Sequence, residues 1–285
     1  MLSEIDVNIP IDNIKINFDT EGLWILNIAL AVIMFGVALS IKLSDFKRLL
    51  QNPKVLLEGI FSQFIILPAL TFAAIVIIKP HPSFALGMMM IAACPGGNVS
   101  NFFSKMAKGN AALSVSLTAF ATVICLIMTP FNLQFYGGLY EPTNEILKTV
   151  ELNPFELFKL ILLILGIPII IGMALNHFYE NVAKKIETVL KPFSMIVFLA
   201  LITIAFYENI EIFLEYIHLV AALVIFHNIG AYVIGFYSAK SFGLKKREQK
   251  TISMETGIQN GGLGLLLIFQ FFDGLGGMAL LAAFW

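Results

Sequence analysis

Long apolar runs follow one another along almost the whole chain, separated by short polar stretches. Several of them reach about 18 residues, enough for a helix to cross ~30 Å of hydrocarbon. The pattern predicts nine membrane spans, the last of which is shorter than the ~20 residues usually needed and is expected to be truncated. Their expected positions are 23–41, 55–78, 83–104, 111–129, 155–176, 192–207, 217–238, 251–272 and 275–285.

Composition agrees that the chain resides in a membrane. Hydrophobic residues make up 58% of the 285 residues and charged residues 13%, whereas a soluble domain has about 25% charged residues. The mean hydropathy is +0.87. The net charge of −1 argues against a nucleic-acid partner. We therefore expect an all-α, polytopic membrane protein.

Lys and Arg residues fall mainly in alternate loops, which indicates the orientation of the chain, because cytoplasmic loops are richer in them. Alternation puts three on one side, namely Lys15, Lys79 and Lys148, and leaves Lys159 just inside a span. The other side receives fourteen: Lys42, Lys47, Arg48, Lys54, Lys105, Lys108, Lys184, Lys185, Lys191, Lys240, Lys245, Lys246, Arg247 and Lys250. We expect an external N-terminus and an external segment 130–154, and a cytoplasmic segment 239–250 and C-terminus, in the cell membrane.

Two spans are interrupted by polar residues and glycines. In the third span, Pro95, Gly96 and Gly97 cannot sustain a regular helix, and a polar run begins at Asn98. In the eighth span, Glu255 precedes a run of amides and glycines. A charged group in a span is costly and indicates function, and unwound backbone is tolerated there only when it is buried in protein or lines a cavity.

The two interruptions occupy related positions. Gln63 precedes Asn98 by 35 residues, and Asn228 precedes Asn260 by 32. The third and eighth spans run in opposite directions. Two similar units of opposite orientation are typical of an inverted-repeat transporter, in which broken helices meet near the middle of the membrane. We expect spans 1 to 4 to pair with spans 6 to 9, leaving span 5 alone.

Broken helices provide ligands for ions of either sign. Free carbonyls and side-chain oxygens suit a hard cation, whereas the N-terminus of a half-helix suits an anion. Glu255 would neutralise a cation, and Gln259, one turn later, would supply an amide oxygen. The alternative is that such polar groups only hold helices together.

At these residues the chain resembles the bile acid:sodium symporter family, in its nine-span form. The resemblance runs through nearly all the spans. It is carried by IMFGVALSIKLSDF (33–46), CPGGNVSN (94–101), GNAALSVSLTAFAT (109–122) and ETGIQNGG (255–262). It implies a secondary active transporter, not an enzyme, that couples an organic anion to two sodium ions by alternating access.

The resemblance also implies two sets of sodium ligands that share Glu255. The first set is Ser100, Asn101, Ser114, Thr118 and Glu255. The second set is Gln63, Glu255, Gln259 and the backbone carbonyls around Thr256 and Ile258. The spacing supports the first set, because residues four apart, such as Ser114 and Thr118, share one face of a helix. We expect no other metal, no cofactor and no requirement for an oligomer.

Family members carry bile acids, small hydroxy or keto acids, or sulfated steroids, so an organic anion is the expected substrate. We expect its carboxylate near Asn98 and Asn260, with Asn228 close by. The resemblance implies a panel subdomain (22–42 and 155–210) that moves against a core subdomain (55–130 and 217–285), after an external tail (1–21).

Three other functions remain as alternatives, and each would require a different chemical feature. A sodium-independent carrier such as an arsenite exporter would use the thiol of Cys94. A channel would need a repeated ring of carbonyls or charges. An intramembrane enzyme would need a second carboxylate beside Glu255, and Glu58 is expected instead to pair with Lys54, four residues earlier, at the cytoplasmic edge.

Overall fold

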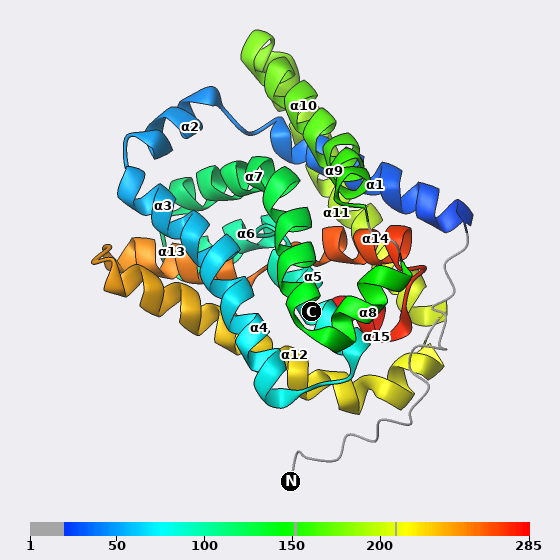
Figure 1. Cartoon of the computed structure of the whole chain (residues 1–285). Coiled ribbons are helices and arrows are strands. Elements are labelled where there is room, and N and C mark those ends of the chain that lie inside the picture. Colours follow the sequence, from blue (N-terminus) through cyan, green and yellow to red (C-terminus); the bar gives the residue numbers. More distant parts are fainter. Residues whose placement is uncertain (1–19, 151–152, 209) are drawn as a thin grey trace.

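The computed structural model describes residues 20–150, 153–208 and 210–285, and the elements within these ranges are helices (Figure 1). They are α1 (Thr20–Ala38), α2 (Leu43–Leu50), α3 (Pro53–Phe61), the π-helical turn η2 (Ser62–Ile66), α4 (Leu67–Ile78), α5 (Pro82–Ala93), α6 (Asn98–Met106), α7 (Ala111–Leu139), α8 (Glu141–Thr149), α9 (Pro154–Ile161), the π-helical turn η3 (Leu162–Gly166), α10 (Ile167–Phe178), α11 (Glu180–Glu208), α12 (Ile210–Ser241), α13 (Lys246–Gly257), α14 (Gly261–Phe271) and α15 (Gly276–Phe284).

Four continuous helices in the described ranges are long and apolar enough to cross a membrane. They are Pro53–Ile78, Ala111–Leu139, Phe155–Phe178 and Val220–Ser241. The prediction of an all-α polytopic membrane protein is therefore confirmed. The count of nine spans stays a prediction.

Some helix ends differ from those expected. Helix α7 continues to Leu139, although its span was expected to end at 129, and it contains Pro130. The segment 130–154, expected as a loop, contains α8. Helix α11 begins at Glu180, well before the expected 192. The apolar pattern marks where a helix meets lipid, and a helix can continue beyond that region and through a proline when its backbone is otherwise satisfied.

The turn η2 follows from the proline that comes after it. Pro68 has no N–H, so the carbonyl of Phe64, four residues earlier, loses its helical partner. The side-chain amide of Asn132 on α7 donates to that carbonyl at 2.9 Å. The widened turn contains Gln63, which is fully buried. The proline thus places a polar side chain of the continuous helix formed by α3, η2 and α4 inside the protein.

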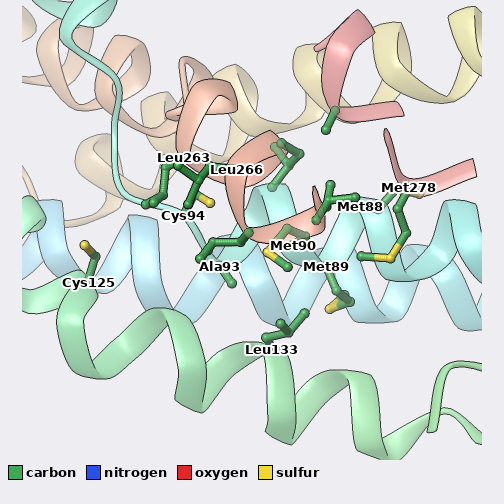
Figure 2. Packing of buried hydrophobic residues seen from close by; sticks show 14 of the residues in the cluster. Met88, Met89, Met90, Ala93, Cys94, Cys125, Leu133, Leu263, Leu266 and Met278 are labelled. Carbon is green, nitrogen blue, oxygen red and sulfur yellow. The ribbon is translucent and has the colours of Figure 1, made fainter. Parts of the chain in front are cut away.

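Helix α5 lies at the centre of the largest apolar cluster (Figure 2). All of its residues from Ser83 to Ala93 are buried. Its Met88, Met89 and Met90 lie near Met278 of α15 and Leu133 of α7. Methionine fills irregular gaps between helices. This packing holds the C-terminal end of α5, and with it the first helix break, in one position.

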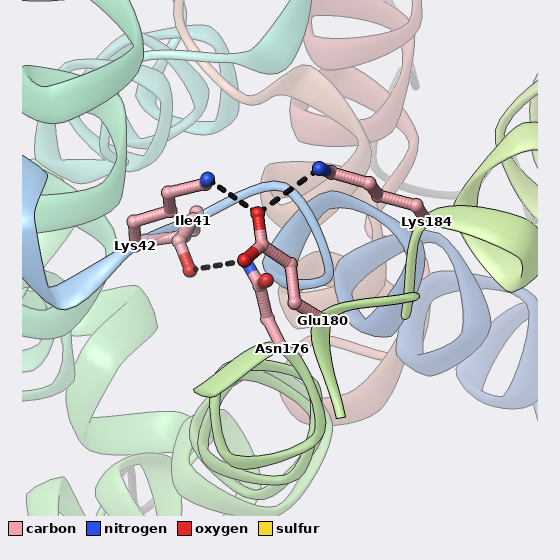
Figure 3. A network of polar contacts seen from close by, with 5 residues as sticks. All are labelled: Ile41, Lys42, Asn176, Glu180 and Lys184. Atoms are coloured by element: carbon pink, nitrogen blue, oxygen red, sulfur yellow. Dashed lines mark hydrogen bonds and ion pairs between the residues drawn. The ribbon is translucent and has the colours of Figure 1, made fainter. Parts of the chain in front are cut away.

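Polar contacts join the end of α1 to the connection between α10 and α11 (Figure 3). Lys42 and Lys184 both contact Glu180 Oε1, at 2.8 and 3.0 Å. Asn176 donates to the Ile41 carbonyl at 3.0 Å. Helix α1 also packs on α10 and α11, and α10 packs on α11, so these three helices form one group.

Two further segments with basic residues, the start of α13 and the connection between α6 and α7, contact each other. Lys250 donates to the Ala107 carbonyl at 2.9 Å, and Arg247 donates to the Gly109 carbonyl at 3.4 Å. The α6–α7 connection therefore lies beside the start of α13. The structure thus brings together, pair by pair, segments whose lysines and arginines were expected on the same side of the membrane.

Candidate functional site at the crossing of two broken helices

The two expected helix breaks are present, and they cross each other. The first separates α5 from α6, and the second separates α13 from α14. The Gly97 N–H donates to the Ile258 carbonyl at 2.7 Å, and the Asn260 N–H donates to the Pro95 carbonyl at 2.8 Å. Between these bonds, Gly96 and Gln259 form an isolated antiparallel bridge. The unwound backbones therefore satisfy each other, as burial in a membrane requires.

The glycines of the first break allow this close approach. A Cβ atom on Gly96 would lie 2.9 Å from both the carbonyl oxygen and the Oε2 atom of Glu255. A Cβ atom on Gly97 would lie 2.9 Å from the Gln259 carbonyl oxygen. Any larger residue at either position would push the two breaks apart. The glycines predicted to interrupt the helix also make the crossing fit.

Glu255 lies at the crossing, and its side chain is fully buried. Ser100 on α6 donates to Oε1 at 2.6 Å, Ser114 on α7 also donates to Oε1, and Thr118 on α7 donates to Oε2 at 2.8 Å. Charge-assisted bonds of this kind are stronger than neutral ones. Three hydroxyl groups from two helices therefore stabilise one buried carboxylate.

Asn101 completes the first expected set of sodium ligands. Its Oδ1 atom lies 3.3 Å from the Thr118 Oγ1 atom. The structure thus brings together all five side chains of that set, from α6, α7 and α13. Each hydroxyl oxygen keeps lone pairs that can face a cation. Oxygen atoms around a single carboxylate suit a hard cation such as sodium.

Residues of the second expected set also meet at Gly96, where a Cβ atom would lie 2.9 Å from Glu255 Oε2 and 3.6 Å from Gln63 Nε2. Gln63 Oε1 accepts from the Gly96 N–H at 3.3 Å, and Gln259 donates through Nε2 to the Thr256 carbonyl at 2.7 Å. The Ile258 carbonyl accepts from Gly97. The buried Gln259 Oε1 and Gln63 Nε2 atoms have no hydrogen-bond partner. An unpaired buried oxygen such as Gln259 Oε1 fits a cation ligand.

The ends of four half-helices meet at this point. Helices α5 and α13 end here, so their C-terminal carbonyls carry partial negative charge, whereas α6 and α14 begin here and present partial positive charge. The crossing can therefore favour a cation on one side and an anion on the other. In the described part of the chain, no group of three His, Cys, Asp or Glu residues could hold a metal ion of the transition series.

A cavity of about 240 Å³ lies next to the crossing. The residues that line it are Val99, Phe103, Asn228, Tyr232, Gly257, Ile258, Gln259 and Trp285. A Cβ atom on Gly257 would lie 2.2 Å from the Tyr232 ring, so the ring packs directly against the backbone of α13. The cavity therefore shares Ile258 and Gln259 with the second set of expected sodium ligands.

Of the three residues expected to bind the anion, only one is among the described residues that line the cavity. Asn228 lines the cavity and donates to the Gly257 carbonyl at 2.9 Å. Asn260 is not among the described residues lining the cavity, and its Oδ1 atom caps α14 by accepting from the Leu263 N–H at 3.0 Å. Asn98 begins α6, but its side chain lies outside the described part of the structure.

Sequence reasoning missed several residues at this site. Ser62 Oγ lies 2.9 Å from Thr256 Oγ1, and Tyr232 and Phe103 line the cavity. Ser62 directly precedes Gln63, which was a usable signal. Cys94, the residue behind the arsenite-exporter alternative, is fully buried beside Leu263 and Leu266 (Figure 2). An apolar environment of this kind suits a packing role for the thiol.

Comparison with known proteins gives an independent result. The model of the Sodium Bile acid symporter family matches residues 27–216. An uncharacterized sodium-dependent transporter of Bacillus subtilis (strain 168), YocS, is 31% identical over 262 residues, which cover 91% of this chain and 79% of that protein.

Two further relatives come from eukaryotes. A probable sodium/metabolite cotransporter of Arabidopsis thaliana chloroplasts, BASS1, is 28% identical over 246 residues, or 86% of this chain. The human ileal sodium/bile acid cotransporter is 28% identical over 238 residues, or 83% of this chain. The aligned region spans 59% of the Arabidopsis protein and 66% of the human one.

Proposed function

The chain belongs to the sodium bile acid symporter family, a family of transporters and not of enzymes, and we propose that it carries an organic anion into the cell together with sodium ions. The relatives are named as sodium-dependent transporters or as cotransporters of sodium with a bile acid or a metabolite. Bile acids and many small metabolites carry a carboxylate, so an organic anion is the substrate class that these names share.

The observation that carries the proposal is the environment of Glu255. Its buried carboxylate accepts hydrogen bonds from Ser100, Ser114 and Thr118 at the crossing of the broken helices. A full charge at this position costs free energy that a bound cation would offset. One sodium ion would bind among Glu255 and these hydroxyls with Asn101. A second would bind between Glu255, Gln63, Gln259 and the carbonyls near Thr256 and Ile258.

The anion would bind in the cavity beside the second ion. Asn228 and Tyr232 line it from α12, and the first turn of α6 borders it at Val99. The N-terminal end of α6 would attract the carboxylate, and sodium at the adjoining site would add positive charge. The anion and the ions would then each favour the binding of the other, which is the coupling a symporter needs.

Alternating access would move two parts of the protein against each other. The panel would contain α1, α9, α10 and α11, and the core would contain the two crossing helix pairs with α3, α4, α7, α12 and α15. The packing of α1 on α10 and α11 supports such a panel. Both ion sites would lie in the core, so they would move as one unit.

Uptake by liposomes that contain the purified protein tests the proposal. The test substrates would be a bile acid, a small hydroxy acid and a small keto acid, each with an inward gradient of sodium or of choline. We expect uptake of at least one anion with sodium and none above protein-free liposomes with choline. Two sodium ions and one monovalent anion carry one net charge, so a membrane potential of about 100 mV would add ~2.3 kcal/mol of driving force. Equal uptake in sodium and choline would contradict the proposal.

A further inference from the structure

A second buried carboxylate lies outside the sites described above. Glu58 is in the second turn of α3, and its side chain is fully buried. Ser238 on α12 donates a hydrogen bond to Glu58 Oε1. The other oxygen, Oε2, is buried without a hydrogen-bond partner. A buried carboxylate with one unsatisfied oxygen is destabilising unless it takes up a proton or a cation lies beside it.

The cation expected to neutralise Glu58 does not do so. Lys54 lies one turn earlier on the same helix, but its side chain is exposed, and its Nζ atom lies 3.8 Å from the position of a Cβ atom on Gly243. No ion pair between described residues includes Glu58. The expected Lys54–Glu58 pair is therefore wrong, because the carboxylate turns into the protein while the ammonium group stays in water.

Buried apolar residues lie close to Glu58 and Ser238 in the chain. Leu56, Leu117, Ala239 and Ile252 belong to one buried cluster at this end of α3, α7, α12 and α13. The rings of Phe61 and Phe242, about one turn beyond Glu58 and Ser238, lie with their centroids 6.2 Å apart. Because the Glu58 side chain is itself fully buried, water is limited at the carboxylate, and an electrostatic interaction with a cation is stronger there than at an exposed surface.

Side chains with oxygen atoms lie between Glu58 and the crossing. Ser62 follows Glu58 by four residues, so the two side chains lie on one face of the continuous helix formed by α3 and η2. Ser62 Oγ lies 2.9 Å from Thr256 Oγ1. Thr256 is next to Glu255 in the chain, and its carbonyl accepts from Gln259. These contacts lead from Ser62, one turn after Glu58, to residues of the second expected sodium site.

We propose that Glu58, Ser62 and Ser238 form a further sodium site at the α3–α12–α13 interface, which an ion occupies after it leaves the crossing. The oxygen ligands and the single negative charge suit a monovalent hard cation. Lys54 and the basic start of α13 place this end of the helices on the side expected to be cytoplasmic. The direction of ion movement rests on the proposed sodium symport, whereas the site itself rests only on the contacts of Glu58.

Binding of radioactive sodium to the purified full chain, with choline keeping the ionic strength constant, tests the site. Glu58→Gln keeps the shape of the side chain and removes its charge. We expect one component of sodium binding to weaken by at least about tenfold, as for other charges removed from buried pairs. Ser238→Ala should weaken the same component less, and it serves as the second variant should Glu58→Gln fail to fold.

Two matched controls are needed. The first tests whether Lys54, and not sodium, neutralises the charge of Glu58, and the second tests whether replacing any glutamate would weaken sodium binding. Lys54→Gln should leave sodium binding unchanged if Glu58 binds sodium, but should alter it if Lys54 neutralises Glu58. Glu145→Gln changes an exposed glutamate on α8 and should have no effect. The proposal would be overturned if folded Glu58→Gln bound sodium like the wild type. It would also be overturned if folded Ser238→Ala bound sodium like the wild type while Lys54→Gln altered the binding.

The same binding measurement distinguishes a failure of the Glu58 site from a failure of the sodium sites at the crossing. Glu255→Gln should remove binding at the crossing and retain the Glu58 component. If Glu255→Gln binds sodium like the wild type while Glu58→Gln does not, the assignment of the crossing is wrong and the Glu58 site stands. If only Glu255→Gln loses binding, the Glu58 site is wrong and the crossing stands.

Discussion

Ser100 donates a hydrogen bond of 2.6 Å to the carboxylate of Glu255, although 155 residues separate them in the sequence. Ser100 follows the first helix break, and Glu255 precedes the second. The bond therefore joins the two breaks into one polar site, which neither segment forms by itself. Substitutions can test the groups that make this site, the backbone that brings it together and the placement of the chain in the membrane.

The hydroxyl groups around Glu255 should matter individually for sodium affinity. Ser114→Ala removes one donor to the carboxylate, and a hydrogen bond to a charged group is worth about 1.5–3 kcal/mol. We expect the sodium affinity of the first site to fall by about tenfold or more. Gln63→Ala should affect mainly the second site. The sodium dependence of uptake would be measured for both variants.

Ser116→Ala is the matched control for Ser114→Ala. Ser116 lies two residues further along α7, is also buried, and donates to the Ala112 carbonyl of its own helix at 2.9 Å. Its loss should leave the sodium dependence of uptake unchanged. Equal effects of the two alanine variants would mean that packing of α7, and not the hydroxyl at Glu255, explains the defect.

Gly96 should be required for the crossing itself. The added methyl group of Gly96→Ala would lie 2.9 Å from the Glu255 carbonyl and carboxylate oxygens, so we expect sodium-driven uptake to be lost and the melting temperature to fall. Gly230→Ala on α12 is the control, because its Cβ atom would meet no other atom within 4 Å. Alanine should stabilise that helix interior by ~0.5–1 kcal/mol. A Gly96→Ala protein with normal uptake would show that the close approach is unnecessary.

The orientation of the chain can be tested by labelling single cysteines in membranes. The native Cys94 and Cys125 are fully buried, so background labelling should be low even without replacing them. Lys148→Cys on α8 should react with an impermeant reagent from outside, and Lys246→Cys at the start of α13 only from the cytoplasm. Labelling of both positions from the same side would contradict the expected topology.

The contacts of Glu180 predict a dependence of stability on pH. Hydrogen bonds from Lys42 and Lys184 lower the pKa of the exposed Glu180 carboxylate from 4.5 to about 2. Because the pKa is lower in the folded protein, the stabilisation is present above pH 4.5 and is lost as the pH falls towards 2. The effect should be small, because the side chains are exposed and salt screens them.

Melting temperatures of the wild type and Glu180→Gln would test this contribution. We expect the wild type to melt slightly higher at neutral pH and low salt, and the difference to shrink at high salt and below pH 4.5. A difference that stays constant down to about pH 3 would show that the Glu180 charge does not stabilise the fold.

The sequence predicted the parts of the structure that depend on local chemistry. Pro95, Gly96 and Gly97 cannot continue a helix in lipid, and a buried Glu255 needs partners, so both breaks were predictable. The four-residue spacing of Ser114 and Thr118, with the resemblance to the family, placed both hydroxyls at Glu255. Each of these predictions follows from a residue whose conformation or charge leaves few alternatives.

Features that depend on contacts between distant helices were not predictable. Glu58 was expected to pair with Lys54 on its own helix, but it turns towards Ser238, 180 residues away in the sequence. The Glu58 side chain had a possible local partner and a distant one, and the packing of other helices decided between them.

The sodium dependence of anion uptake by liposomes containing Glu255→Gln tests the central claim most directly. Glutamine keeps the shape and one oxygen acceptor of Glu255, but it removes the negative charge assigned to both sodium ions. At matched amounts of protein, and with Glu145→Gln as the control for an exposed glutamate, we predict that Glu255→Gln loses sodium-driven uptake more completely than Ser114→Ala or Gln63→Ala. Sodium dependence in Glu255→Gln equal to that of the wild type would contradict the assignment of both ions to this carboxylate.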